Sequence, residues 1–136
     1  MSVPNPVTIL LVDNDEKDRS YYGQRLKVCS PEYVILEANT GISALQLCQS
    51  HRISCIVTEL DLPDMSAFEL LLRAVPSGSV PRVAVIILAQ FVLPNIAQLA
   101  RANGAQACLM KRFTSGDDLE QYILRALSAI ETKLAH

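Results

Sequence analysis

The sequence has no tryptophan, few other aromatic residues and no long run of charge of either sign. Aromatic residues make up 5% of the chain, and 12 Lys and Arg residues nearly balance 14 Asp and Glu residues. A chain with this balance and no basic cluster lacks the charge pattern of proteins that bind nucleic acid or an anionic membrane surface. We therefore expect neither nucleic acid nor a membrane as a partner.

Long apolar runs and closely spaced cysteines are also missing. No apolar run approaches the ~20 residues that a membrane span requires, and the first residues show no basic segment followed by an apolar one. The four cysteines are widely spaced and form no CxxC pair: Cys29, Cys48, Cys55 and Cys108. This spacing favours free thiols over zinc ligation or disulfides, and the absence of a targeting segment predicts a cytoplasmic protein.

The chain instead contains five short apolar runs, each followed by a segment with helical spacing. The runs cover residues 7–12, 33–38, 55–58, 82–88 and 107–110, and the helical segments cover residues 16–28, 42–51, 66–75, 94–103 and 115–134. Runs that are apolar on both faces are typical of strands buried in a parallel sheet. Alternating strands and helices predict an α/β fold, a flavodoxin-like doubly wound sheet of five parallel strands in the order 2-1-3-4-5.

Length and composition suit a single domain, because 136 residues with 50% hydrophobic content can bury one core. We expect this domain to cover residues 4–130, with residues 131–136 as a helical extension or the start of a linker. The third helical segment should end at the breaker cluster of residues 76–79.

Acidic residues end two of the predicted strands. Asp13 follows the first strand and Glu59 follows the third, and in the predicted strand order these two strands are neighbours. Ligands of open α/β sheets bind at this carboxyl edge, where the strand order reverses. Residues 13–16 also have the short polar and acidic side chains that cap a helix, so capping by Asp15 or its neighbours is expected as well.

Residues 59–67, ELDLPDMSA, resemble the third-strand motif of response-regulator receiver domains, which normally begins with an Asp that accepts a phosphoryl group. The resemblance extends over residues 7–129 and implies that Glu59 stands at the acceptor position. It also identifies Lys111 as the family's retained lysine. Ala89 stands where the family has a Thr or Ser, and Cys108 stands where it has an aromatic switch residue.

The same resemblance implies a magnesium site formed by Asp13, Asn14, Glu59 and the backbone carbonyl of Asp61. Asn14 is a neutral oxygen ligand where the family has a second acid, and Mg²⁺ prefers anionic oxygens. We therefore expect weak Mg²⁺ binding at best, and no other cofactor. Arg112 replaces the family's proline after Lys111, so a trans peptide is expected there.

These departures favour an atypical receiver domain of two-component signalling, a pseudo-receiver that is not phosphorylated and not an enzyme. Glu59 carries one methylene more than Asp, and a displacement of the order of 1 Å can cost ~100-fold in rate. We expect Glu59 to form a direct ion pair with Lys111 instead. A receiver that is still phosphorylated at Glu59, Asp61 or Asp13 remains the close alternative.

Two further hypotheses assign the chain to other functional classes, an enzyme and a cofactor-binding module. Residues 10–15, LLVDND, also resemble the first-strand motif of haloacid-dehalogenase-type phosphatases, in which Asp13 would be the nucleophile and Asp15 the acid/base. Lys111 and residues 116–118 could serve that scheme, but position 17 is Lys, the second-strand Thr or Ser motif is not evident, and 136 residues leave no room for a cap. A flavin-binding module would require a Ser-, Thr- and Gly-rich phosphate loop after the first strand, which the sequence does not have.

The expected partners are proteins: a histidine kinase, an output domain or a phosphorelay component. The resemblance places docking, and potential homodimerisation, on the fourth helix, fifth strand and fifth helix. Residues 91–93, FVL, are apolar where loops are normally polar. Apolar residues recur at spacings of four, three and four along the last helix: Ile123, Leu127, Ile130 and Leu134. This spacing suggests a helix that pairs with its twin, and the alternative is that Ile123 and Leu127 only pack on the sheet while the tail frays.

Overall fold

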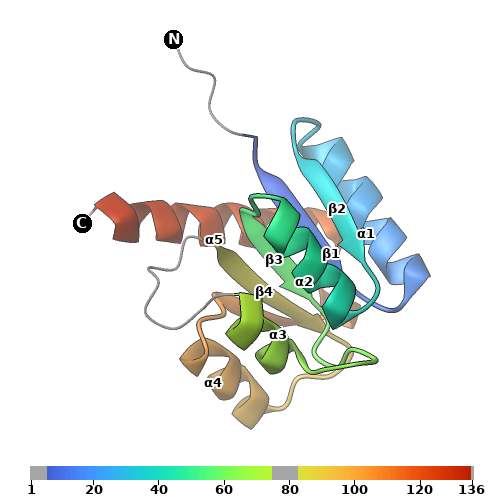
Figure 1. Cartoon of the computed structure of the whole chain (residues 1–136). Coiled ribbons are helices and arrows are strands. Elements are labelled where there is room, and N and C mark those ends of the chain that lie inside the picture. Colours follow the sequence, from blue (N-terminus) through green and yellow to red (C-terminus); the bar gives the residue numbers. More distant parts are fainter. Residues whose placement is uncertain (1–5, 75–82, 136) are drawn as a thin grey trace.

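The computed structural model describes residues 6–74 and 83–135, with side chains as far as Ile130, and contains a five-stranded parallel sheet (Figure 1). The strand order is β2-β1-β3-β4-β5, as the sequence predicted. The strands are β1 (Thr8–Val12), β2 (Val34–Ala38), β3 (Cys55–Thr58), β4 (Ala84–Ala89) and β5 (Ala107–Met110). The predicted helix end at residues 76–79 and the predicted start of the fourth strand at Arg82 lie outside the described residues.

The helices alternate with the strands and begin and end close to the predicted residues. They are α1 (Glu16–Cys29), α2 (Gly41–Ser50), α3 (Ala67–Ala74), α4 (Pro94–Ala102) and α5 (Gly116–Ala135). A short 3₁₀ helix, η1 (Lys111–Phe113), follows β5 and was not predicted. Within the described residues, no helix is both long enough and apolar enough to cross a membrane.

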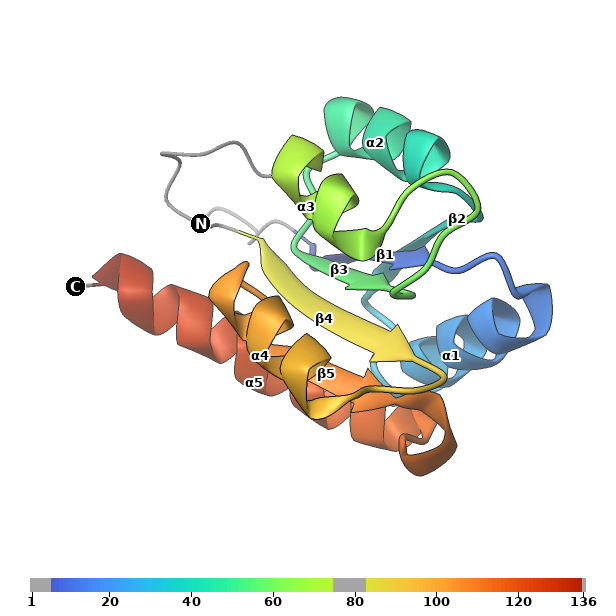
Figure 2. The ribbon, with the colours of Figure 1, turned by 90° about the horizontal axis from the view of Figure 1, so that it is seen from below.

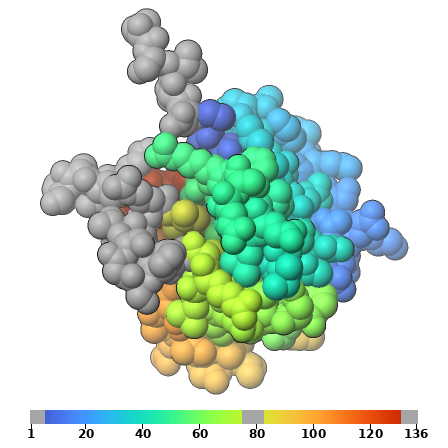
Figure 3. Space-filling model, in the orientation of Figure 1, coloured from blue at the N-terminus to red at the C-terminus, as the bar shows by residue number. Residues whose placement is uncertain are grey.

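Helices lie on both faces of the sheet (Figures 1 and 2). Helices α1 and α5 pack side by side on one face, where their side chains join those of alternate strand residues in one core cluster. Helices α2, α3 and α4 cover the opposite face over two further clusters. Figure 3 shows α2 and α3 in front of the sheet, with α4 below them.

The apolar runs form strands because both of their faces are buried. All five residues of β1 are buried, and successive side chains point to opposite faces. Ile9 and Leu11 pack in the cluster beneath α1 and α5, whereas Leu10 and Val12 pack in the cluster beneath α2. Strands β3 and β4 are likewise buried at every position, which explains why their sequences do not alternate with polar residues.

The last helix differs from its predicted role. Ile123 is 0% and Ile130 is 6% exposed, and half-buried Leu127 packs against the same core cluster. The apolar stripe of α5 therefore contributes to the core over these residues, and the expectation that it forms a helix-pairing surface is wrong for them. The side chain of Leu134 lies outside the described residues.

Parallel register brings the strand ends to one edge of the sheet. Val12 of β1 aligns with Thr58 of β3, and Ala89 of β4 aligns with Met110 of β5. The residues that follow these strands are therefore neighbours in space although they are far apart in the sequence. This edge carries Asp13, Glu59 and Lys111.

Candidate functional site

Lys111 lies at the centre of the site, at the start of η1 directly after β5. Its Nζ atom lies 2.7 Å from Oδ2 of Asp13, 2.8 Å from Oδ2 of Asp18 and 2.8 Å from Oε2 of Glu59. The Lys111 side chain is 7% exposed. Burial by itself lowers the pKa of Lys111, but hydrogen bonds to Asp13, Asp18 and Glu59 outweigh burial and raise this pKa above its usual range. The predicted Glu59–Lys111 ion pair is confirmed.

The two strand-end carboxylates are engaged on both of their oxygens. Glu59 accepts a hydrogen bond from the Leu60 backbone N–H on Oε1 at 3.0 Å and contacts Lys111 through Oε2. Asp13 accepts from the Asp15 backbone N–H on Oδ1 at 2.9 Å and contacts Lys111 through Oδ2. Each carboxylate is therefore oriented by its own loop on one oxygen and by the shared ammonium on the other.

Asp18 is the site residue that sequence reasoning missed. It lies in the first turn of α1, where acids complement the positive end of the helix dipole, and this general role concealed its specific contact. The side chain of Gln90, just after β4, donates to Asp18 Oδ2 at 3.5 Å. Residues 13–18 contain more acidic residues than one helix cap requires, and this excess could have pointed to a further role for Asp18.

Arg19, the next residue of α1, holds the backbone of the same loop. Its Nη1 atom donates to the carbonyl oxygen of Asp13 at 2.6 Å, and its Nε donates to Oε1 of Glu37 on β2 at 2.9 Å. The Arg19 side chain is 16% exposed, so these contacts lie largely beneath the surface. They fix the turn between β1 and α1 that presents Asp13 to Lys111.

The other polar residues that the sequence analysis placed at this edge form no hydrogen bond or salt bridge with Lys111 in the described part of the chain. Asp15 is the N-cap of α1 and accepts a hydrogen bond from the Asp18 backbone N–H at 3.0 Å, which confirms the predicted cap and lowers the pKa of Asp15. Asn14 and Asp61 are exposed and line the mouth of the pocket above Lys111. Both acids of the alternative phosphatase motif, Asp13 and Asp15, are thus held by backbone N–H groups.

The arrangement does not fit a bound magnesium ion. An ion held by Asp13 and Glu59 would need carboxylate oxygens that the Lys111 ammonium already contacts. Among the residues that the structure describes, no group of three or more His, Cys, Asp or Glu side chains is placed to hold a metal. In this conformation a protein cation occupies the position between the two acids.

The two residues that the resemblance places at switch positions are Ala89 and Cys108, and both pack in the core. Ala89 ends β4 and is 1% exposed, and its methyl group cannot donate a hydrogen bond. Cys108 is half-buried on β5 and packs against the core cluster beneath α3 and α4. The peptide between Lys111 and Arg112 is trans, as expected.

A second contact that the sequence analysis missed fixes the loop between β3 and α3. Asp64 accepts hydrogen bonds from the backbone N–H groups of Gly41 at 2.8 Å and Ile42 at 2.9 Å, at the start of α2. These two bonds, Gly41 first, lower the pKa of Asp64. The side chain of Met65 fills the space where a Cβ at Gly41 would stand, so this helix start requires glycine.

The loop between β4 and α4 exposes the apolar residues that the sequence analysis selected. Phe91 is 75% and Leu93 is 62% exposed, whereas Val92 is half-buried and packs against the cluster beneath α3 and α4. Phe91 therefore lines the pocket that contains Lys111, whereas Leu93 is exposed at the N-cap of α4.

Solved structures with this fold include a CheY-like receiver domain protein from Methanospirillum hungatei, with a TM-score of 0.82, 23% sequence identity and coverage of 95% of this chain and 99% of that chain. The receiver domain of a LuxO repressor protein from Vibrio parahaemolyticus also has a TM-score of 0.82, at 24% identity and with 95% of each chain covered. At these identities the likeness establishes the fold alone.

Related sequences agree with the fold. The two-component response regulator-like protein APRR9 of Arabidopsis thaliana is 27% identical over 132 residues, which are 94% of this chain but 28% of the relative's length. The two-component response regulator ARR16 of the same plant is 29% identical over 122 residues, with 80% of this chain and 74% of the relative covered. The response regulator receiver domain family matches residues 9–124, most of the chain, and the chain therefore belongs to that family.

Proposed function

We propose that this receiver domain signals without aspartyl phosphorylation, by presenting one fixed conformation to a protein partner. The observation that carries this proposal is the contact of Lys111 with Asp13, Asp18 and Glu59 at 2.7 to 2.8 Å. A receiver that switches must offer its acceptor carboxylate to a phosphoryl group and its acids to a metal ion. Here the ammonium contacts the residue at the acceptor position and both neighbouring acids.

The chemistry of the surrounding positions supports the same conclusion. Phosphoryl transfer depends on positioning and on neutralisation of charge, and Glu59 is longer than Asp and already paired. A phosphoryl group would also find no hydroxyl at Ala89. A ligand shifts a conformational equilibrium only through contacts that differ between two states, and Ala89 cannot supply such a contact. We expect the fixed conformation to resemble the unphosphorylated state of the family.

Under this proposal the domain has no catalytic activity and needs no Mg²⁺. It acts in the cytoplasm through a protein partner of two-component signalling, such as a histidine kinase, an output domain or a phosphorelay component. The surface formed by α4, β5 and α5 is the proposed docking face, and a second copy of the chain is a further candidate occupant.

The test is incubation with acetyl phosphate, or with a phosphorylated histidine kinase, in the presence of Mg²⁺, followed by intact mass spectrometry. A receiver domain known to be phosphorylated serves as the positive control in the same tube. We expect the mass of this chain to remain unchanged. A gain of one phosphoryl group that disappears in Asp13→Asn or Glu59→Gln would contradict the proposal, and Mg²⁺-dependent hydrolysis of a generic phosphate ester would favour the phosphatase alternative.

A further inference from the structure

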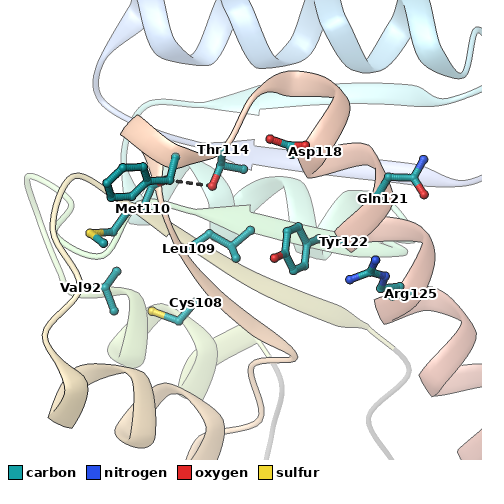
Figure 4. A pocket seen from close by; sticks show the side chains of 10 residues that line it. Val92, Cys108, Leu109, Met110, Thr114, Asp118, Gln121, Tyr122 and Arg125 are labelled. Carbon is teal, nitrogen blue, oxygen red and sulfur yellow. Dashed lines mark hydrogen bonds between the residues drawn. The ribbon is translucent and has the colours of Figure 1, made fainter.

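A groove of about 550 Å³ follows β5, between the loop before α4 and the outer side of α5 (Figure 4). Its polar rim includes Asp118, Gln121 and Arg125 on α5. Its apolar and aromatic lining residues are Val92, Cys108, Leu109, Met110, Phe113 and Tyr122. Strand β4 pairs with one edge of β5, and the groove lies on the other side of β5.

Strand β5 is an edge strand with free backbone groups. It is the last strand in the sheet order, so no other described strand pairs with its outer edge. The Gln106 N–H donates to the Val85 carbonyl at 2.8 Å, which sets the backbone of Gln106 and Cys108 toward β4. Because successive residues of a strand alternate, the N–H and C=O groups of Ala107 and Leu109 face the free edge.

This edge lacks the features that usually prevent another strand from adding to a sheet. Native edges commonly carry charges, proline or a bulge. The sequence of β5, ACLM, has no charged residue and no proline. The opposite edge differs, because β2 carries exposed Glu37, which Arg19 holds at 2.9 Å.

The surroundings of the groove are positively charged although the chain has a net charge of −2. The Arg125 guanidinium lies 5.5 Å from the ring centre of Tyr122, and the Arg112 guanidinium lies 4.9 Å from that of Phe113. Burial raises the pKa of the Cys108 thiol, and the charge of nearby Arg101 opposes this effect.

These arginines have no acidic partner among the side chains of residues 6–74 and 83–130. None of Arg101, Arg112 and Arg125 forms a salt bridge with a carboxylate among the side chains that the structure describes. The carboxylate at the groove, Asp118, accepts a hydrogen bond from the Ser115 backbone N–H at 3.0 Å and so caps α5. Asp118 also forms no salt bridge with a described side chain, but three arginines outnumber this one carboxylate, so the net charge next to the groove is positive.

We propose that the free edge of β5 binds an extended, acidic segment of a partner protein, which adds to the sheet as a sixth strand. This inference rests on the proposed function, in which the domain acts through a protein partner, and it names the chemistry of that partner. Backbone groups of the segment pair with those of Ala107 and Leu109. Alternate apolar side chains of the segment enter the groove, and its carboxylates meet Arg112 and Arg125.

The unpaired backbone groups favour an extended segment over a helix, because a helix satisfies its own backbone and leaves the edge unpaired. The apolar side chains that line the groove favour a peptide over a nucleic acid, whose affinity depends chiefly on phosphate contacts. A second copy of this chain is a less complementary occupant, because its own β5 edge carries the same positive surroundings.

The first experiment pans phage-displayed random dodecapeptides on the intact protein and measures the affinity of the enriched peptides by fluorescence polarisation. We expect enrichment of sequences that alternate apolar residues with Asp or Glu. The double substitution Arg112→Glu and Arg125→Glu should lower the affinity by about tenfold or more, with a reduced dependence on salt. Arg52→Glu, the same charge change at an exposed position after α2, is the matched control and should have no effect.

The second experiment tests backbone pairing without altering the protein. N-methylation of alternate residues of the enriched peptide should abolish binding in one of the two registers and leave it intact in the other. Amide hydrogen exchange at Ala107 and Leu109 should slow when the unmodified peptide is bound, because these N–H groups become donors to the added strand.

Several outcomes would overturn the inference: no enrichment, enrichment of basic peptides, equal affinity of both N-methylated peptides, or no protection of Ala107 and Leu109. Tight binding of a single-stranded RNA oligonucleotide that the arginine substitutions abolish would assign the surface to nucleic acid. A dimer in sedimentation that the same substitutions dissociate would assign it to a second copy. Peptides that bind away from β5 would refute this site but leave the proposed function intact, which only the phosphorylation assay contradicts.

Discussion

The Nζ atom of Lys111 lies 2.8 Å from Oδ2 of Asp18 and so joins the end of β5 to the first turn of α1. The same ammonium contacts Asp13 after β1 and Glu59 after β3. One lysine therefore connects four elements that are distant in the sequence. Three carboxylates surround this one cation, so the local charge is negative overall. The stability of this edge therefore depends on the positive charge of Lys111.

Lys111→Met should destabilise the fold strongly, because it leaves the side chains of Asp13 and Glu59 facing each other at 12% and 15% exposure without a cation. Removal of one partner from a buried ion pair costs ~3–5 kcal/mol, and partial exposure favours the lower end of this range. We expect a loss of about 3 kcal/mol in the free energy of unfolding by urea at pH 7.

Lys17→Met is the matched control, since it removes an exposed positive charge beside the same pocket. Surface substitutions usually change stability by less than about 0.5 kcal/mol. Equal losses in the two variants would show that the contacts of Lys111 contribute nothing beyond general charge balance.

Asp64 should make the stability of the loop between β3 and α3 depend on pH. Hydrogen bonds from Gly41 and Ile42 lower its pKa in the folded protein below the unfolded value of about 3.9. The stabilisation is therefore present above that value and is lost as the pH falls through the folded pKa. Asp64→Ala should be less stable than wild type at pH 6, and the difference should shrink below about pH 4.

Urea unfolding between pH 6 and pH 3 measures this effect. Asp61→Ala is the control, because Asp61 is an exposed acid of the same loop whose side chain accepts no hydrogen bond from the described residues. A difference between wild type and Asp64→Ala that stays constant with pH would refute the role of the Asp64 carboxylate.

Two glycines should respond to alanine in opposite directions. A Cβ at Gly41 would overlap the side chain of Met65, whereas a Cβ at Gly23 would lie 3.5 Å from Leu11 Cδ1, in ordinary contact. Gly41→Ala should cost about 1–3 kcal/mol through overpacking. Gly23→Ala lies inside α1 and should stabilise the protein by about 0.5–1 kcal/mol, because glycine is unfavourable there.

Thermal and urea unfolding of both variants decides this comparison. Met65→Ala removes the overlapping side chain, so Gly41→Ala should cost less in that background than in wild type. If Gly41→Ala is as harmless as Gly23→Ala, the close packing of Met65 on α2 has been overestimated.

Strand order and most helix boundaries could be predicted from the sequence, because fully apolar runs such as β1 and helix caps such as Asp15 are local signals. Asp13 and Glu59 could be brought together because the predicted strand order makes their strands neighbours. The contact of Lys111 with Glu59 was predicted from the resemblance to receiver domains and from the extra methylene of Glu59.

The contacts that were missed depend on side chains from helices and loops. Asp18 and Asp64 sit in segments where an acid has an ordinary local role, and only the packing of α1 and α2 on the sheet directs them to Lys111 and Gly41. The role of the stripe of α5 was left open between two alternatives for a related reason. A helical spacing of apolar residues is the same for a helix that packs on a sheet as for one that packs on its twin.

Restoration of the family's residues should restore a response to a phosphoryl analogue. Glu59→Asp shortens the side chain that pairs with Lys111, Asn14→Asp adds an anionic oxygen at the exposed side of the pocket, and Ala89→Ser supplies a hydroxyl at the end of β4. With Mg²⁺ and beryllofluoride, we expect amide shifts in residues 90–93 of the triple variant and none in wild type. Glu59→Asp alone is the matched intermediate and should show small shifts, because the acid at position 14 and the hydroxyl at position 89 are still missing. Amide spectra recorded during titration provide the measurement. Shifts in wild type as large as those of the triple variant would show that the pocket still responds to a phosphoryl analogue and that the contacts of Lys111 do not hold it in one conformation.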